Sequence, residues 1–193
     1  MAAIPRILAF AGSTRTDSFN KRLIKIAVAG ARAAGAEVTL IDLRDYPLPL
    51  FDGDLEAQEG IPPNGRKLKN LFLGHHGLLM SCPEYNSSIT GVWKNTIDWV
   101  SRPVPGEGPL ACFDGKVAAL MSASPGALGG LRGLVHVRAI LGNIRVLVLP
   151  DQVAVSKAGE AFNPDGSLKD PKQHAAVEAI GAKLTQLLAT LHP

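Results

Sequence analysis

Residues 83–102, with the sequence PEYNSSITGVWKNTIDWVSR, hold the residue types best suited to chemistry in this chain. A short apolar run at 78–82 ends at Pro83, and an amphipathic helix pattern begins a few residues later. This pattern predicts a strand, a tight loop and a helix, and open parallel sheets bind ligands in loops of this kind. Tyr85 offers a flat ring and a hydroxyl, and the amide of Asn86 can donate and accept hydrogen bonds. The loop therefore suits a planar ring with polar edges.

A second segment, residues 12–20 with the sequence GSTRTDSFN, has the composition of an anion-binding loop. Gly12 allows a sharp turn after an apolar run, and several hydroxyl side chains follow it. The N–H groups and dipole at the start of the next helix favour an anion, and the guanidinium of Arg15 fits a phosphate. The segment matches neither the Walker A nor the G-x-G-x-x-G pattern. An ordinary helix capped by Asp17 or Ser18 is the alternative, and Asp17 would repel a phosphate unless it points away.

The elements that would position these two segments alternate along the whole chain. Apolar runs at 7–10, 38–41, 78–82, 117–121 and 144–149 predict five strands. Helical periods at 20–34, 65–72, 90–101, 128–141 and from Asp170 onward predict five helices. The strands are apolar without alternation, as expected for a sheet covered on both faces. We therefore predict one α/β domain over residues 1–193, with a five-stranded parallel sheet.

One predicted loop, residues 45–63, is unusually long. Loops of this length are commonly functional or ordered by a partner. It carries the apolar residues Leu48, Leu50, Phe51 and Leu55, which are poorly placed in water. A subunit interface or a pocket wall is expected to cover them.

Composition excludes several classes of protein. With 46% hydrophobic and 19% charged residues, 193 residues can fold as one domain. The net charge of +3 comes from scattered basic residues, so no nucleic-acid partner is expected. No apolar stretch approaches the ~20 residues that cross a bilayer, and no signal peptide is evident. The two cysteines, Cys82 and Cys112, predict a cytoplasmic protein without a disulfide framework. The adjacent His75 and His76 would point in different directions, so no metal site is expected.

Together, GSTRTDSFNKRL and PEYNSSITGVWKNTIDWVSRP resemble the signatures of the NADPH-dependent FMN reductase family. That family includes flavodoxin-like quinone, chromate and azo-dye reductases. LPLFDGDLE, SASPGALGGLR and AFNPDGSLKD are also similar to family segments and occur in the family order, so the resemblance covers nearly the whole chain. It implies a flavodoxin-like three-layer sandwich that binds FMN. Thr90 departs from the pattern, because the family often has proline there.

The resemblance also implies which residues contact the flavin. The GSTRTDSFN segment would hold the FMN phosphate through Ser13, Arg15, Ser18 and Asn20. The PEYN segment would lie against the isoalloxazine and ribityl chain through Pro83, Glu84, Tyr85 and Asn86. The loop after the fourth strand would close the far side of the flavin through Ser122, Ser124 and Gly126.

An enzyme of this family would pass electrons from NADPH or NADH through FMN to a quinone, an azo compound, a metal oxyanion or dioxygen. The flavin would carry the chemistry, so no catalytic side chain is assigned. Family members usually form dimers or tetramers, which implies a homo-oligomer here. Two alternatives stay open: a flavodoxin-type electron carrier and a non-catalytic flavin-binding module. The charge of +3 weighs against the carrier, because carriers generally present an acidic docking surface. Arg15 also weighs against it, because the phosphate loop of carriers is rich in hydroxyls and uncharged.

Overall fold

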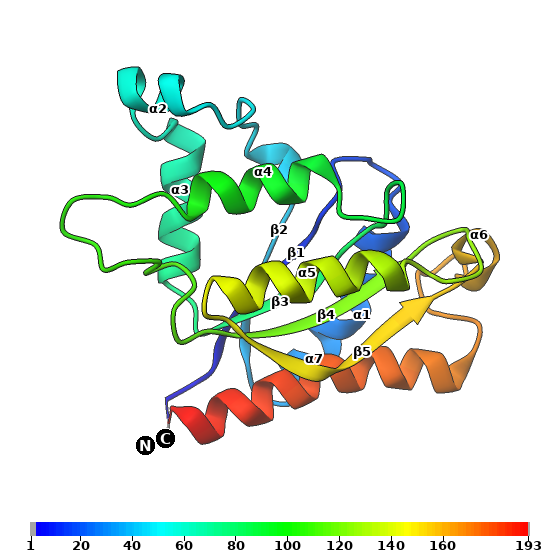
Figure 1. The fold of residues 1–193 in the computed structure, drawn as a ribbon. Coiled ribbons are helices and arrows are strands. Elements are labelled where there is room, and N and C mark those ends of the chain that lie inside the picture. The colour runs from blue at the N-terminus through cyan, green and yellow to red at the C-terminus, as the bar shows by residue number, and fades with distance from the viewer. Residues whose placement is uncertain (1–2, 193) are drawn as a thin grey trace.

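Five parallel strands form the centre of the molecule in the computed structural model, which describes residues 3–192 (Figure 1). They are β1 (Arg6–Ala11), β2 (Glu37–Ile41), β3 (Gly77–Ser81), β4 (Val117–Ala123) and β5 (Leu147–Val155). Their spatial order is β2-β1-β3-β4-β5, and every neighbouring pair is parallel. This is the order of flavodoxin-like doubly wound sheets. The predicted flavodoxin-like α/β fold is confirmed.

Helices cover both faces of this sheet. The helices of residues 3–192 are α1 (Phe19–Ala33), α2 (Gly53–Glu59), α3 (Pro63–Leu73), α4 (Gly91–Val100), α5 (Leu131–Asn143), α6 (Ala158–Ala161) and α7 (Pro171–Leu191), with a short 3-10 helix, η1 (Leu43–Asp45), and α2 lies away from the sheet. Successive strand side chains point to opposite faces. Ile7 and Ala9 therefore pack with α1 and α7, whereas Leu8 and Phe10 pack with α3, α4 and α5. Figure 1 shows α4 and α5 on one side of the sheet and α7 on the other.

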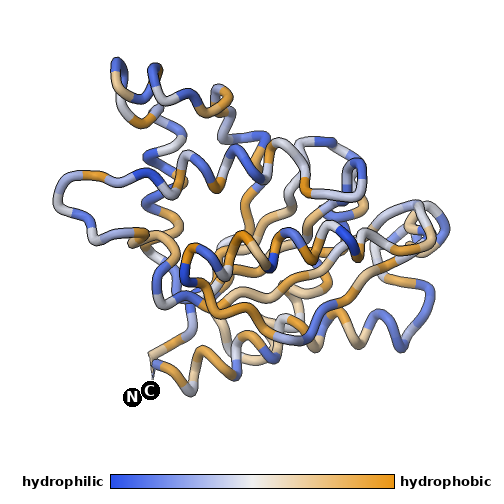
Figure 2. Tube along the Cα trace, in the orientation of Figure 1, coloured by the Kyte–Doolittle hydropathy of each residue, from blue (hydrophilic) through white to orange (hydrophobic). Residues whose placement is uncertain are grey.

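The hydrophobic pattern along the chain follows this arrangement. The strands at the centre are coloured as hydrophobic, whereas the covering helices alternate between hydrophobic and hydrophilic residues (Figure 2). Every residue of β3 and β4 is buried, which explains why their sequences show no alternation. Two predicted helix starts are confirmed by their caps. The Thr90 hydroxyl accepts from the N–H of Trp93, and the Asp170 carboxylate accepts from two N–H groups of α7.

The fifth strand differs from the predicted range of 144–149. Ile144 ends α5 instead, and Arg145 takes a left-handed conformation with φ 69° before the strand begins. The strand then continues to Val155 through Pro150, Asp151 and Gln152. Polar residues and a proline are tolerated there because β5 is an edge strand that pairs only with β4.

The predicted loop at 45–63 is partly helical. The Asp52 carboxylate caps α2 by accepting from the N–H groups of Asp54 and Leu55. None of the α2 residues is buried, so the helix has no apolar periodicity by which the sequence could reveal it. Among the apolar residues of this segment, Phe51 packs edge-on against Trp99 with ring centroids 5.1 Å apart, whereas Leu50 is 80% exposed.

Within residues 3–192, no helix combines the length and the apolar character that crossing a membrane requires.

Candidate functional site

Three loops meet at the carboxyl ends of the central strands. We call residues 12–18 after β1 the first loop, residues 82–90 after β3 the second loop, and residues 124–130 after β4 the third loop. The strand order reverses between β1 and β3, because β2 lies on the far side of β1. Such switch points are where open α/β sheets bind ligands. The fold therefore brings both sequence motifs to the expected ligand-binding edge.

A small cavity of about 60 Å³ lies where the three loops meet. Eight of the residues predicted to contact a cofactor line it: Ser13, Arg15, Ser18, Asn20, Pro83, Glu84, Tyr85 and Ser124. Phe19, Ala123 and Pro125 complete the lining. The other three predicted residues, Asn86, Ser122 and Gly126, lie outside it.

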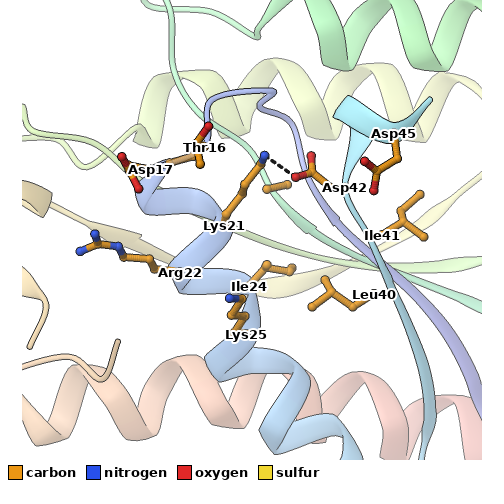
Figure 3. A pocket seen from close by; sticks show the side chains of 12 residues that line it. Thr16, Asp17, Lys21, Arg22, Ile24, Lys25, Leu40, Ile41, Asp42 and Asp45 are labelled. Atoms are coloured by element: carbon orange, nitrogen blue, oxygen red, sulfur yellow. Dashed lines mark hydrogen bonds and ion pairs between the residues drawn. The ribbon is translucent and has the colours of Figure 1, made fainter. Parts of the chain in front are cut away.

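The first loop presents donors to this cavity. Ser18 is the N-cap residue of α1, but its side chain makes no capping hydrogen bond, and the first turn of α1 contains no acidic residue. Arg15 is exposed at the rim. Asp17 lines a different cleft beside α1 and is not among the residues that line the small cavity (Figure 3). Hydroxyls, a guanidinium and a helix N-terminus together suit an anion such as a phosphate.

Asn20 joins α1 to two strands through a buried side chain. Its Nδ2 donates to the carbonyl of Ala123 at 2.8 Å. Its Oδ1 accepts from the Ser81 hydroxyl at 2.8 Å and from the Ala123 N–H at 3.0 Å. These bonds occupy the amide at both ends. Asn20 therefore fixes the start of α1 relative to the ends of β3 and β4.

Glu84 anchors the second loop to the start of α5. Its carboxylate accepts from Arg132 Nε at 2.9 Å and also from Arg132 Nη2, and from the Gly133 N–H at 3.1 Å. Burial acts to raise the pKa of the Glu84 carboxyl, because its side chain is only 7% exposed. The hydrogen bonds from Arg132 and Gly133 outweigh burial, and the pKa lies below its usual value. Glu84 is therefore ionised at neutral pH and holds the second loop.

Asn86 and Ser87 form the tip of the second loop. Both have positive φ, 51° and 64°, and the flanking Tyr85 and Ser88 exchange two backbone hydrogen bonds of 3.0 Å. This is the geometry of a two-residue hairpin turn, in which asparagine is favoured at positive φ. The turn explains Asn86 without a ligand, and it leaves the Tyr85 side chain half exposed beside the cavity.

Thr90, where the resembling family often has proline, links the first two loops. Its hydroxyl donates to the Gly12 carbonyl at 2.7 Å and accepts from the Trp93 N–H at 3.3 Å. Gly12 itself packs tightly, since a Cβ there would lie 3.1 Å from Trp93 Cβ. The sequence identified Thr90 as a helix cap, but only the structure shows that it also holds the first loop.

The third loop is closely packed against its neighbours. Ser122 is fully buried beneath Gly130, and its hydroxyl has no hydrogen-bond partner within residues 3–192. Gly130 has φ 92° and no room for a side chain on this side. The Ser124 hydroxyl accepts from the Gly126 N–H at 3.3 Å. In this arrangement Ser124 reaches the small cavity, whereas Ser122 supports the loop from below.

A larger cleft of about 510 Å³ lies between α1 and β2 and was not identified from the sequence (Figure 3). An ion pair between Lys21 and Asp42 spans it. Leu40 and Ile41 form part of its wall, and Asp45 lies at its rim. The larger cleft is lined by both carboxylates and basic side chains, and some of these are paired with each other. The hydroxyls and the guanidinium that line the small cavity therefore make it the better site for an anion.

Other chemically reactive side chains lie outside this constellation. Cys82 is buried in the core, and burial raises the pKa of its thiol. The ring of His75 is hydrogen-bonded to the Leu71 carbonyl and the Thr39 hydroxyl, and the ring of His76 stacks on that of His192. Among the described residues, no group of three potential metal ligands comes together.

Known proteins resemble this chain in sequence and in fold. A family model described as NADPH-dependent FMN reductase matches residues 5–160. The chain is similar to an NAD(P)H-dependent FMN reductase of Pseudomonas aeruginosa, with 34% identity over 90% of this chain and 89% of the relative. It is also similar to a quinone reductase of Escherichia coli K12, with 33% identity over 75% of this chain and 73% of the relative.

Solved structures of flavoenzymes are similar to this chain as well. A flavoenzyme NAD(P)H:(acceptor) oxidoreductase from Paracoccus denitrificans matches with a TM-score of 0.80 and 26% identity. The match covers 98% of this chain and 99% of that one.

Proposed function

This chain belongs to the NADPH-dependent FMN reductase family and is an oxidoreductase, and we propose that it transfers electrons from NADPH or NADH through one bound FMN to a small acceptor. The observation that carries the proposal is the small cavity, where residues of both sequence motifs and of the third loop converge. Relatives named as quinone reductases support a quinone as the acceptor, and azo compounds, metal oxyanions and dioxygen are the other candidates.

The residues that line the cavity fit the phosphate end of FMN. Ser13 on the first loop and Ser18 at the start of α1 are buried hydroxyl residues, and Arg15 provides a cation at the rim. The first turn of α1 adds a positive dipole end without an opposing carboxylate. We assign the phosphate to these three side chains. Asn20, whose amide bonds to Ser81 and Ala123, holds the start of the helix in place.

The second and third loops would hold the rest of the cofactor. Pro83 and Tyr85 would lie along the flavin, and Glu84 would keep their loop against α5. Ser124 and Gly126 would close the other side. The chemistry that FMN supplies when bound is the transfer of hydride and electrons. The task of the protein is therefore to bind and orient, with no general acid, nucleophile or metal among its assigned residues.

We also propose a homodimer or homotetramer that works in the cytoplasm. Exposed apolar side chains support association: they are Leu50 on the segment before α2, Leu128 on the third loop, and Leu131 and Val135 on α5. A second copy would cover such side chains. Both cysteines are free and buried, which is compatible with a reducing compartment.

The visible spectrum of the purified protein, before and after anaerobic addition of NADPH, tests the proposed function. We expect bound FMN that NADPH bleaches rapidly and that quinone or air restores. Bound FMN that NADPH cannot reduce would favour an electron carrier instead. Protein that binds no FMN, even when FMN is added, would refute the proposal.

A further inference from the structure

Arg44 lies outside both sequence motifs, yet its side chain reaches the first loop. It belongs to η1, the short helix after β2. Its Nε donates to the Thr14 carbonyl at 2.8 Å, and its Nη2 donates to the same oxygen. Its Nη1 donates to the Thr16 hydroxyl at 2.8 Å. Three N–H groups of one planar guanidinium therefore hold two residues of the proposed phosphate-binding loop.

The backbone of Arg44 is itself fixed. Asp42 caps η1, and its Oδ1 accepts from the Arg44 N–H at 3.0 Å. The other carboxylate oxygen accepts from Lys21 on α1, an ion pair visible in Figure 3. The guanidinium is thus carried by a turn that is tied to the same helix that follows the first loop. Arg44 is therefore held in place and can hold the first loop in one position.

The bond to the Thr14 carbonyl orients a peptide unit. In a trans peptide the C=O and the following N–H point in opposite directions, and no cis peptide occurs within residues 3–192. Thr14 and Arg44 line a cleft of about 480 Å³ on one side of the loop, whereas Ser13 and Arg15 line the small cavity on the other. While Arg44 holds the Thr14 carbonyl, the Arg15 N–H is directed away from Arg44.

The Arg15 N–H makes only a long bond in this structure. It donates to the Ser13 hydroxyl at 3.3 Å, and Ser13 is a lining residue of the small cavity. A phosphate oxygen is a stronger acceptor than a hydroxyl, because hydrogen bonds to charged groups are stronger than neutral ones. A ligand phosphate could therefore take over this donor, provided that the peptide does not rotate.

We propose that Arg44 is a positioning residue for phosphate recognition: by holding the Thr14 carbonyl and the Thr16 hydroxyl, it keeps the Arg15 N–H available to the phosphate of the cofactor. This inference rests on the proposed FMN function. It predicts that Arg44 contributes to binding of flavins that carry a phosphate and not to binding of the same ring without it.

The test compares FMN with riboflavin, which lacks the phosphate, by titrating flavin fluorescence against the apoprotein. For Arg44→Ala we expect the Kd for FMN to rise about tenfold, the effect of one charge-assisted hydrogen bond, while the Kd for riboflavin is unchanged. Arg32→Ala is the matched control. Arg32 is also exposed and donates to the carbonyl of Val38 in β2, and none of its hydrogen bonds within residues 3–192 reaches the first loop. It should leave both affinities unchanged.

Arg44→Lys separates positioning from simple attraction between charges. Lysine keeps the positive charge but lacks the planar fork, so most of the loss in FMN affinity should remain. It also keeps the test valid if the alanine variant folds poorly. Full recovery of FMN affinity by lysine, or equal losses for FMN and riboflavin, would overturn the inference. If the wild-type protein binds FMN and Arg44→Ala binds it equally well, the inference fails while the proposed function stands. A wild-type protein that binds no FMN overturns both.

Discussion

Replacing Glu84 by glutamine tests whether an ion pair at the start of α5 holds the second loop. The carboxylate accepts from Arg132 through one oxygen and from the Gly133 N–H through the other. Glutamine has nearly the same shape, but it must turn its NH2 group toward one of these donors. The variant therefore loses one of the two contacts and the negative charge at the helix N-terminus.

The expected cost follows from the burial of the two partners. A hydrogen bond to a charged group contributes about 1.5–3 kcal/mol. Arg132 is 55% exposed, so water screens its interaction with the carboxylate. We therefore expect the free energy of unfolding to fall by about 2 kcal/mol at neutral pH. Because the second loop carries Pro83 and Tyr85, the Kd for FMN should also rise about fivefold, as a moderate loss of fixed geometry implies.

The stabilising effect of Glu84 should depend on pH in a defined direction. Its pKa in the folded protein is lowered, whereas an unfolded glutamate titrates at about 4.3. A group with a depressed pKa contributes stability that is fully present above the unfolded pKa and is lost as the pH falls through the folded pKa. The difference in the free energy of unfolding between wild type and Glu84→Gln should therefore be constant near neutral pH and shrink below about pH 4.3.

Urea denaturation at a series of pH values measures this difference, and FMN titration at neutral pH measures the effect on the site. Glu107→Gln is the matched control. Glu107 pairs with Arg66 and Lys69, its pKa is also lowered although burial acts to raise it, and it lies outside the small cavity. It should lower stability with the same pH dependence and leave the Kd for FMN unchanged. A Glu84→Gln protein as stable as wild type at neutral pH would refute the reasoning.

Three further predictions follow from the same contacts. Arg15→Ala should weaken FMN binding at least several-fold, as measured by titration, because it removes the cation at the phosphate end; unchanged affinity would contradict the phosphate assignment. Thr90→Val should lower the free energy of unfolding, measured by urea denaturation, by about 2 kcal/mol, because it removes a helix cap and leaves the Gly12 carbonyl without its donor. Thr96→Val should lower it less, because within residues 3–192 the Thr96 hydroxyl bonds only to the Val92 carbonyl of its own helix. Both thiols should react with a thiol reagent only as fast as the protein unfolds, since both are buried and burial raises their pKa values; rapid reaction of the native protein would disprove this.

The sequence by itself determined the elements whose signals are local. Apolar runs located β1, β3 and β4 closely, because central strands covered on both faces are apolar along nearly their whole length. Side-chain caps marked helix starts at Thr90 and Asp170, because a cap bonds to N–H groups two or three residues away. Each of the two motif loops is also a continuous segment of the sequence, so both could be identified from the sequence, and they indicated the family.

Only the tertiary structure decided the features that depend on partners far apart in the chain. Asn20 lines the small cavity, as a residue predicted to contact the cofactor, and only the structure shows that its amide also bonds to Ala123, 103 residues away. Arg44 reaches the first loop only because η1 follows the strand next to β1. The polar residues within β5 are likewise explained only by its edge position in the sheet. Local patterns encode elements, whereas side-chain partners are set by which elements the fold brings together.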